Sequence, residues 1–291
     1  MTVPVLAGLK DLPSRYAGLI VDLWGVIHDG ITPYPGVIEA MAAVKDSGRS
    51  LVMLSNAPRR AQALIELMTD MGIARHLYDD IITSGEAVFD ELLTRRDPWF
   101  AKLGRRCLHM GTERDRDLFE GLSLDLVDDL GQAQFLLVTG PDDYEDRVED
   151  FMPLMDSAKA RGLPMVCANP DLVVIRSGRP LVCAGALAAY YGDIGGDVCY
   201  RGKPDPAIYD VCIERMGISD RSRVLGVGDA FATDVAGARA AGIDSLLCTG
   251  GIHAEEIGTV YGRRPNPIRL EAAIRAREPL RPTFAIGGFL W

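Results

Sequence analysis

The sequence predicts an α/β protein built on a doubly wound parallel sheet, with a second, smaller α/β unit inserted into the chain. Short apolar runs alternate with helical patterns from one end of the chain to the other. The runs are continuously apolar, as expected for parallel strands that are buried on both faces. No internal repeat or low-complexity tract interrupts the alternation, which excludes solenoid folds.

The expected strands and helices follow one another in the order that parallel sheets require, because parallel strands need long crossover connections. The expected strands are residues 19–23, 50–55, 106–110, 134–139, 164–168, 223–228 and 244–249. The expected helices, several opened by proline or a small polar residue, are residues 36–47, 58–72, 84–95, 144–161, 184–192, 205–216, 232–241 and 267–277.

Two polar stretches indicate domain junctions. Residues 95–106 are charged and irregular, and residues 192–198 are rich in glycine. We therefore expect residues 1–84 and 196–291 to form a discontinuous core domain. Residues 85–195 would then form an inserted domain of ordinary size.

Composition restricts the function classes. The chain has 291 residues with 31 basic and 41 acidic side chains, a formal net charge of −10. This balance argues against partners that are nucleic acids or anionic membranes, so an anionic ligand must be held locally by a metal, a lysine or backbone amides. Six cysteines without a C-x-x-C pair, and no targeting or membrane-spanning run, predict a reduced cytoplasmic protein.

The chain ends on an apolar stretch, R-P-T-F-A-I-G-G-F-L-W over residues 281–291. An exposed patch of this kind is a liability in a monomer. We expect the stretch to dock on the core, and a homodimer contact is the alternative.

Ligands of parallel α/β sheets bind beyond the carboxyl ends of the strands. Four polar stretches follow expected strands or lie close to them, and they contain Asp22, Ser55-Asn56, Lys203, and Asp229 with Asp234. Each residue alone fits a turn, a helix cap or a solvated side chain. Asp229 and Asp234, however, flank a short loop and could face one hard cation.

Two nucleotide-binding motifs are missing from the sequence. Gly226-x-Gly228 lacks the third glycine of a dinucleotide fingerprint and follows a late strand. No G-x-x-x-x-G-K-[ST] loop occurs either.

In their order along the chain, these stretches resemble the four motifs of the haloacid dehalogenase (HAD) superfamily. The stretches are D-L-W-G-V at 22–26, L-S-N at 54–56, R-G-K-P-D-P at 201–206 and G-D-A-F-A-T-D at 228–234. T-S-G-E at 83–86, A-N-P-D at 168–171 and A-G-A-L-A at 184–188 are similar to class IIA, which includes NagD-type and 4-nitrophenyl phosphatases. The resemblance implies a Rossmann-like core with an inserted α/β cap of the C2 type.

The resemblance also implies a reaction, the hydrolysis of a small phosphorylated substrate through an aspartyl-phosphate. Its implied nucleophile is Asp22 and its cofactor is Mg²⁺. The implied roles of the other residues are as follows: metal binding for Asp22, Asp229, Asp234 and the backbone carbonyl of Trp24; charge balance for Lys203; phosphoryl and substrate contacts for Ser55, Asn56, Gly25, Asn169 and Asp171.

Trp24 departs from the pattern of the resembled phosphatases, which have a second aspartate two residues after the nucleophile. An indole offers one N–H donor and no group that titrates near neutral pH. General acid–base assistance is worth about 10²–10⁴-fold. With Trp24 at this position, the resemblance implies weak or narrow phosphatase activity that favours good leaving groups. His28 and Asp29 are possible substitutes, although H-D-G is also a natural turn.

Two alternatives stay open at this level. The protein could be a catalytically impaired protein that binds a phosphate or metabolite, with Trp24 packed under the cap. It could also cleave a bond other than a phosphate ester, as superfamily members without the second aspartate do. A carbon–phosphorus cleavage would need a cap lysine, and Lys102 and Lys159 are the lysines of the inserted region.

Overall fold

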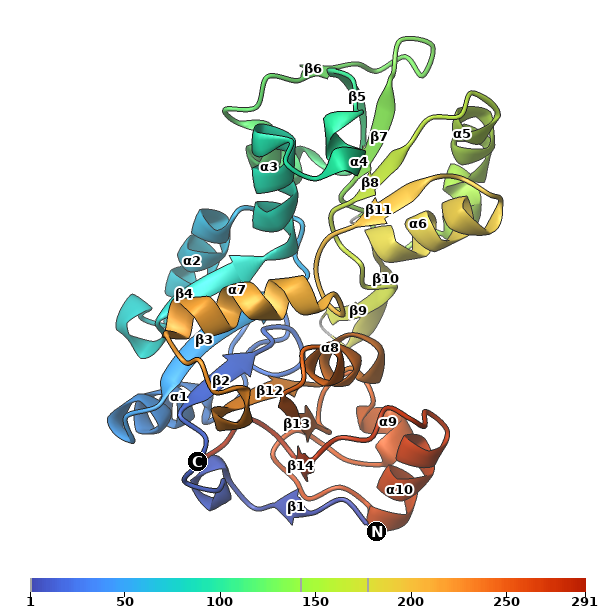
Figure 1. Ribbon diagram of the computed structural model, residues 1–291. Helices are drawn as coiled ribbons and strands as arrows, with labels where there is room; N and C mark the ends of the chain where they lie inside the picture. Colours follow the sequence, from blue (N-terminus) through green and yellow to red (C-terminus); the bar gives the residue numbers. More distant parts are fainter. Residues whose placement is uncertain (1, 142, 177) are drawn as a thin grey trace.

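The computed structural model describes residues 2–141, 143–176 and 178–291, and these residues contain two parallel sheets (Figure 1). The larger sheet pairs all of its neighbouring strands in parallel. From one edge to the other its strands are β1 (Val5–Leu6), β14 (Phe284–Ile286), β13 (Asp244–Cys248), β12 (Val224–Gly228), β2 (Gly18–Val21), β3 (Ser50–Ser55) and β4 (Asp80–Thr83).

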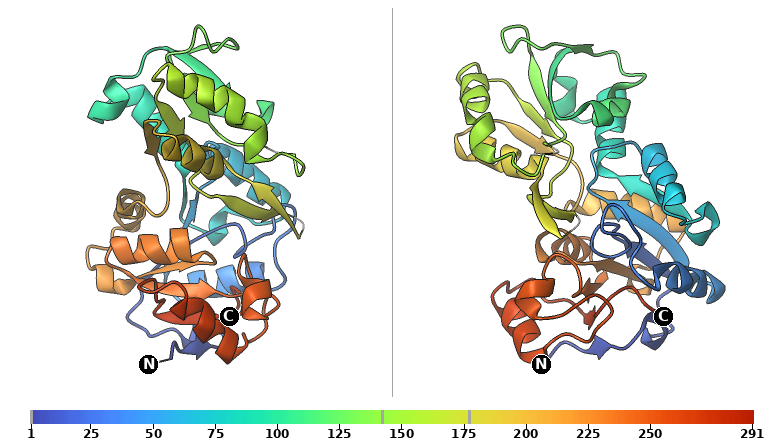
Figure 2. Two further views of the ribbon diagram at one scale, coloured as in Figure 1. Left: turned by 90° about the vertical axis from the view of Figure 1, so that its right-hand side faces the viewer. Right: turned by 180° about the vertical axis from the view of Figure 1, so that it is seen from behind.

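The smaller sheet is also parallel throughout. Its strands, in order, are β11 (Val198–Tyr200), β8 (Met165–Cys167), β7 (Phe135–Val138), β5 (Arg106–Met110) and β6 (Asp125–Leu126). An antiparallel hairpin, β9 (Val173–Arg176) with β10 (Arg179–Val182), extends from this unit toward the larger sheet (Figure 2).

Helices cover both faces of the larger sheet, which makes it doubly wound. Apolar side chains of α1 (Val37–Asp46) and α2 (Ala61–Asp70) pack with Leu19 and Leu51 on one face. Side chains of α7 (Pro206–Met216) and α8 (Ala236–Ala240) pack with Ile20 and Val52 on the other. Neighbouring strand residues thus point to opposite faces and both are buried, which explains the continuous apolar runs.

The remaining helices are short or cover the smaller sheet. They are α3 (Ser84–Thr94), α4 (Pro98–Ala101), α5 (Val148–Ala160), α6 (Ala184–Asp193), α9 (Ala254–Ile257) and α10 (Pro267–Arg275). Four 3₁₀-helices are η1 (Leu9–Asp11), η2 (Arg75–Leu77), η3 (Glu113–Phe119) and η4 (Arg221–Arg223) in the described residues. A π-helical segment is η5 (Phe231–Val235).

The predicted fold class is confirmed, and each expected strand and helix has a counterpart in the structure. Boundaries differ by a few residues. The first expected strand ends at Val21 and leaves Asp22 in the following loop. The helix expected from residue 58 begins at Ala61, because Arg60 is its extended N-cap. The shortest strands, β1 and β6, have two residues each and give no periodic signal.

The division of the chain at residues 84/85 and 195/196 stays a prediction. β11 pairs with β8 and lies just beyond the second of these boundaries. Val88 and Phe89 of α3 pack with Phe135 of the smaller sheet. Because β11 is the last strand of the smaller sheet along the chain and ends at Tyr200, the chain returns to the larger sheet near Arg201.

The apolar C-terminal stretch docks on the core, as predicted. β14 pairs with β13 and β1, and the Phe289 side chain is completely buried. The backbone N–H of Leu9 donates to the carbonyl of Leu290 at 2.7 Å. Both chain ends therefore lie beside the larger sheet (Figures 1 and 2).

The six cysteines are free thiols, and all except the half-buried Cys199 are buried. This agrees with the predicted reduced state. Within the described ranges, none of the helices combines the length and the apolar character that crossing a membrane requires.

Candidate functional site

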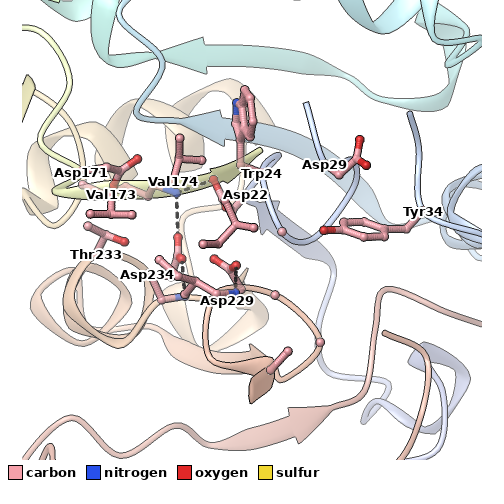
Figure 3. A pocket seen from close by; sticks show the side chains of 18 of the residues that line it. Asp22, Trp24, Asp29, Tyr34, Asp171, Val173, Val174, Asp229, Thr233 and Asp234 are labelled. Carbon is pink, nitrogen blue, oxygen red and sulfur yellow. Dashed lines mark hydrogen bonds and ion pairs between the residues drawn. The ribbon is translucent and has the colours of Figure 1, made fainter. Parts of the chain in front are cut away.

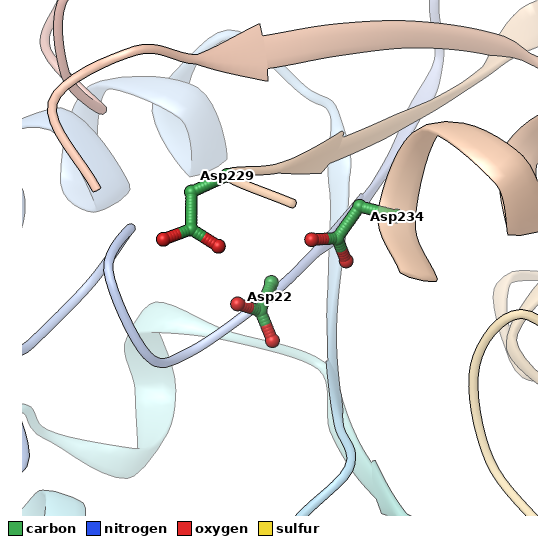
Figure 4. A group of neighbouring side chains, drawn as sticks. All are labelled: Asp22, Asp229 and Asp234. Atoms are coloured by element: carbon green, nitrogen blue, oxygen red, sulfur yellow. The ribbon is translucent and has the colours of Figure 1, made fainter. Parts of the chain in front are cut away.

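Three aspartates converge at the carboxyl end of the larger sheet (Figure 4). Asp22 follows β2 and Asp229 follows β12, and these two strands are hydrogen-bonded neighbours. Asp234 comes from η5, the turn that follows β12. One carboxylate oxygen from each residue lies within 4.8 Å of the others, and all three residues are buried. The sequence separates them by up to 212 residues, and parallel strand pairing brings them together.

Lys203 holds two of these carboxylates. Its ammonium lies 2.6 Å from Oδ1 of Asp22 and 2.7 Å from Oδ1 of Asp234. Burial disfavours the ammonium, but the two carboxylates outweigh this effect and raise the pKa of Lys203 well above its ordinary value. Lys203 is therefore a fixed positive charge beside the predicted nucleophile.

Burial raises the pKa of Asp22 to about 7, although the charge of Lys203 opposes the shift. Burial and the neighbouring carboxylate of Asp22 also raise the pKa of Asp229 well above its usual range. Such clustering of buried like charges is costly in a folded protein without a compensating cation. The cluster thus has the electrostatic character of a site that receives a cation.

Backbone close to Asp229 shapes this cluster. Oδ2 of Asp229 accepts the backbone N–H of Ile252 at 2.7 Å. Gly25 has a φ of +75°, and a Cβ atom there would lie 1.9 Å from Oδ2 of Asp229. A Cβ atom at Gly251 would lie 2.0 Å from the same oxygen. Glycine is required at both positions because the backbone approaches the carboxylate so closely.

Asn56 links the two sheets. Its Oδ1 accepts the backbone N–H of Lys203 at 2.7 Å, and its Nδ2 donates to Oδ1 of Asp171 at 2.8 Å. The backbone N–H of Asp171 donates to Oδ1 of Asn169 at 3.0 Å. Ser55 ends β3, and its Oγ accepts the N–H of Ala57 at 3.2 Å. These polar residues thus orient the loop that carries Asp171 over the larger sheet.

A cavity of about 340 Å³ opens over the aspartate cluster (Figure 3). Asp22, Lys203, Asp229 and Asp234 line it from the larger sheet. Val173 and Val174 of the hairpin face it from the other side, as does Asp171. The cavity therefore lies between the two sheets, with Asp22, Lys203, Asp229 and Asp234 on the wall of the larger sheet and Asp171 opposite them.

The side chain of Trp24 extends away from Asp229 and Asp234 (Figure 3). Its indole packs edge to face against the His28 ring at a centroid distance of 5.4 Å. A Cβ atom at Gly30 would lie 2.2 Å from Cη2 of Trp24, so the glycine makes room for the indole. The residue therefore occupies a built pocket.

His28 and Asp29, the possible substitutes for the missing acid, are engaged in the turn. Nδ1 of His28 accepts the N–H of Gly30 at 3.0 Å, and burial lowers the pKa of His28 to about 4. Oδ1 of Asp29 accepts the N–H groups of Ile31 and Thr32 at 2.9 and 2.8 Å. Both side chains therefore stabilise the turn that the H-D-G sequence predicts.

A second cavity, of about 190 Å³, adjoins the first, because Trp24, Asp171 and Val174 line both. Asn169 lines only the second cavity. Three arginines also face it, Arg59 from the loop before α2, Arg114 from η3 and Arg176 from β9. These arginines are not predictable from the sequence, because each lies in a different segment with no motif around it.

The structure thus brings most of the predicted residues to one crevice. Asp22, Trp24, Gly25, Asp171, Lys203, Asp229 and Asp234 line the first cavity, and Asn169 lines the second. Ser55 and Asn56 are almost fully buried beneath it. The Gly250–Ile252 loop of the site was not predicted, although its two glycines directly follow the expected strand at 244–249.

The donor set of the cluster fits a hard divalent cation. It offers carboxylate oxygens from three residues, which Mg²⁺ prefers over nitrogen or sulfur. Lys203 leaves one oxygen each of Asp22 and Asp234 outside its ion pairs, and Oδ2 of the latter accepts the N–H of Ala230. The residues present therefore fit magnesium, with Asp22 and Asp229 offering the freest oxygens.

Two family models match the chain. Residues 19–125 match a haloacid dehalogenase-like hydrolase family, and residues 200–273 match a HAD-hydrolase-like family. A solved hydrolase of the haloacid dehalogenase-like family from Brucella suis is 32% identical, with a TM-score of 0.82 over 97% of this chain and 99% of that chain.

Curated relatives are more distant. D-glycerol 3-phosphate phosphatase from Mycobacterium tuberculosis is 26% identical over 84% of this chain and 66% of its own length. Ribonucleotide monophosphatase NagD from Escherichia coli is 27% identical over 80% of this chain and 88% of its own length. A glycerol phosphate phosphatase from M. tuberculosis, solved in complex with magnesium, has the same fold with a TM-score of 0.67 at 22% identity over 99% of this chain and 77% of that chain.

Proposed function

The chain belongs to the haloacid dehalogenase-like family of hydrolases, and from this premise we propose that it is a Mg²⁺-dependent phosphohydrolase acting on a small phosphorylated metabolite. The observation that carries the proposal is the convergence of Asp22, Asp229 and Asp234 beside Lys203 in one crevice. Relatives of the class IIA type that are named phosphatases support it.

In this proposal Asp22 is the nucleophile. A carboxylate oxygen of Asp22 attacks phosphorus, and the leaving oxygen departs with the bonding electron pair. This step gives an aspartyl-phosphate and divides one difficult displacement into two easier ones. Lys203 favours the ionised form of Asp22 and orients its carboxylate, because its ammonium lies 2.6 Å from Oδ1.

Asp22, Asp229, Asp234 and the backbone carbonyl of Trp24 would hold Mg²⁺. When bound, the ion neutralises the repulsion between an anionic nucleophile and an anionic substrate. We further propose that Ser55, Asn56 and Gly25 contact the phosphoryl group, and that residues 85–195 act as a cap whose Asn169 and Asp171 face the substrate.

The second half of the reaction lacks the usual acid–base residue. Water must attack the aspartyl-phosphate, and Trp24 can neither accept a proton from it nor protonate the first leaving group. We therefore propose that turnover is weak or narrow. The expected deficit is about 10²–10⁴-fold on poor leaving groups such as alkoxides.

Two other functions remain in competition. A protein that binds a phosphorylated metabolite without turnover would keep the cation cluster and the aromatic wall. A carbon–phosphorus cleavage would need a lysine of the inserted region in the cavity. Lys102 and Lys159 are exposed, and neither is among the residues that line the two cavities. The described residues therefore do not support a carbon–phosphorus cleavage.

The test is an assay with Mg²⁺ on 4-nitrophenyl phosphate and glycerol 3-phosphate. Wild type should hydrolyse the aryl ester, and Asp22→Asn should abolish this activity. Trp24→Asp should raise activity on the alkyl ester, because it restores a titratable group beside the leaving oxygen. Asp125→Asn, the same change on the exposed edge of the smaller sheet, is the matched control.

Each outcome has a clear meaning. Magnesium binding without turnover of either ester would support the binding protein. Halide or aldehyde release from a halogenated or phosphonate substrate would support the other bond cleavage. An alkyl-ester activity that Trp24→Asp leaves unchanged would show that the missing acid does not limit the reaction.

A further inference from the structure

The two cavities form one elongated crevice with Trp24 at the junction. Asp22, Lys203, Asp229 and Asp234 belong to the first cavity alone, whereas Arg59, Arg114 and Arg176 belong to the second alone. A phosphoryl group held at Asp22 could therefore extend its leaving group past the indole toward the arginines. The crevice is charged in opposite senses at its two ends.

The indole is held at this junction. His28 packs against it, and the missing side chain of Gly30 makes space for it. Trp24 therefore forms a fixed apolar wall beside the bond that would break. An apolar wall beside a departing oxygen suits a group that does not need to be protonated as it leaves.

Asp171 is the one described titratable group in the second cavity that competes for the role of the missing acid. Among the described residues that line it, the groups that titrate other than arginine are His28, Asp171 and Cys183. Burial lowers the pKa of His28 and raises that of Cys183. Burial raises the pKa of Asp171, but Lys203 and the hydrogen bond that its Oδ1 accepts from Asn56 favour the carboxylate. The same hydrogen bond holds the Asp171 side chain in the link between the sheets.

The arginines are placed to hold an anion. They come from three separate segments and face one cavity of about 190 Å³. Arg59 approaches Asp117 at 3.9 Å, Arg114 approaches Asp115 at 3.4 Å, and Nε of Arg176 donates to the hydroxyl of Tyr144 at 3.2 Å. A guanidinium has five N–H donors in a planar fork, so it can serve such a partner and a carboxylate or phosphate together.

Resting on the proposed function, we infer that the substrate is a phosphoric anhydride, whose leaving group departs as a phosphate or carboxylate anion into the cavity formed by Arg59, Arg114 and Arg176. Such a leaving group carries its negative charge at neutral pH without protonation. The first step of the reaction then needs no acid at the position of Trp24. The arginines stabilise the negative charge that develops on the leaving oxygen.

The reaction balances without a further reactant. A bond forms between a carboxylate oxygen of Asp22 and phosphorus, and the bridging P–O bond breaks with its electron pair on the departing anion. Water then attacks the phosphorus of the aspartyl-phosphate. The carboxylate of Asp22 is regenerated, and both hydrogens of the water end on the released dihydrogen phosphate.

The experiment compares four probes with the full chain and Mg²⁺. Inorganic pyrophosphate and acetyl phosphate are the two kinds of anhydride, 4-nitrophenyl phosphate has a good leaving group without a second anionic group, and glycerol 3-phosphate has a poor one. We expect kcat/KM for at least one anhydride to exceed that for glycerol 3-phosphate by about 10²-fold or more. The preferred anhydride identifies the leaving group as phosphate or carboxylate.

Arginine variants test the second cavity. Arg59→Gln and Arg176→Gln should each lower kcat/KM for the preferred anhydride about tenfold. The loss for 4-nitrophenyl phosphate should be smaller, because the charge of its leaving group is partly delocalised over the ring. Arg179→Gln is the matched control, because Arg179 lies on the same hairpin, pairs with Glu145 on the surface and lines neither cavity. It should leave all four activities unchanged.

Two results would overturn the inference and leave the proposed function intact. One is hydrolysis of 4-nitrophenyl phosphate with neither anhydride cleaved faster than glycerol 3-phosphate. The other is an efficient glycerol 3-phosphate activity that Asp171→Asn removes, since Asp171 would then be the missing acid. Failure to hydrolyse any probe, with magnesium still bound, would overturn the proposed function itself.

Discussion

The two parallel sheets of this protein share one architecture but differ at the carboxyl ends of their strands. In the larger sheet, β2 and β12 are followed by the buried carboxylates of Asp22 and Asp229. In the smaller sheet, β7 and β8 are followed by neutral polar groups, Thr139 and, two residues after the strand, Asn169. A parallel sheet supplies a crevice, and the side chains at its strand ends decide the chemistry.

The difference is also energetic. At the strand ends of the larger sheet, several carboxylates lie close together, and among the described residues only Lys203 forms ion pairs with them. At the strand ends of the smaller sheet, Thr139 forms a neutral hydrogen bond with His109 at 2.9 Å. Removing charged groups should therefore affect cation binding and stability strongly. Removing neutral ones should have small effects of the ordinary kind.

The largest expected effect is on metal affinity. Asp229→Asn should weaken Mg²⁺ binding by about 100-fold or more, because it removes a charge from the proposed ligand set. Isothermal titration calorimetry measures the change directly. Asp125→Asn, on the smaller sheet, should bind Mg²⁺ as wild type does. Equal affinities for the two variants would contradict the proposed metal site.

Lys203→Met should lower the free energy of unfolding by about 3–5 kcal/mol, because it leaves the buried carboxylates of Asp22 and Asp234 without their cation. Urea denaturation without metal gives this value. The double variant Lys203→Met with Asp22→Asn should recover part of the loss, since one of the uncompensated charges is then removed. A double variant less stable than the single one would refute the electrostatic explanation.

His28 should make stability depend on pH. Its folded-state pKa of about 4 lies below the ordinary value of 6.5, so its contribution is complete above pH 6.5 and is lost as pH falls toward 4. Between pH 7.5 and 5.0 the loss should be about 2 kcal/mol. His28→Asn keeps an acceptor for the N–H of Gly30 and removes the titration, so urea denaturation at the two pH values should show a correspondingly smaller change. The same change in both proteins would contradict the prediction.

The smallest expected effect lies in the smaller sheet. Thr139→Val preserves the shape of the side chain and removes the hydrogen bond to His109, which should cost about 1 kcal/mol in the free energy of unfolding. Magnesium affinity should not change. A loss of magnesium binding in this variant would mean that the strand ends of the two sheets do not differ in the way described above.

Particular residues show how far sequence reasoning reaches. The apolar runs at 50–55 and 106–110 match strands residue for residue, because parallel strands buried on both faces leave a continuous apolar signal. Asp22 and Asp229 were predictable as site residues, since they directly follow such runs. Arg59, Arg114 and Arg176 were not, because no local pattern distinguishes an arginine that faces a cavity from one that faces water.

The sequence alone determined the fold class, the family resemblance, the aspartates and lysine of the site, and the missing acid at Trp24. These features depend on residue type and on order along the chain. The tertiary structure decided how the two sheets meet, that Asn56 bonds both Lys203 and Asp171, and that Trp24 lies between an acidic and a basic cavity. Such relations are set by contacts between segments far apart in sequence, which local propensity and spacing do not encode.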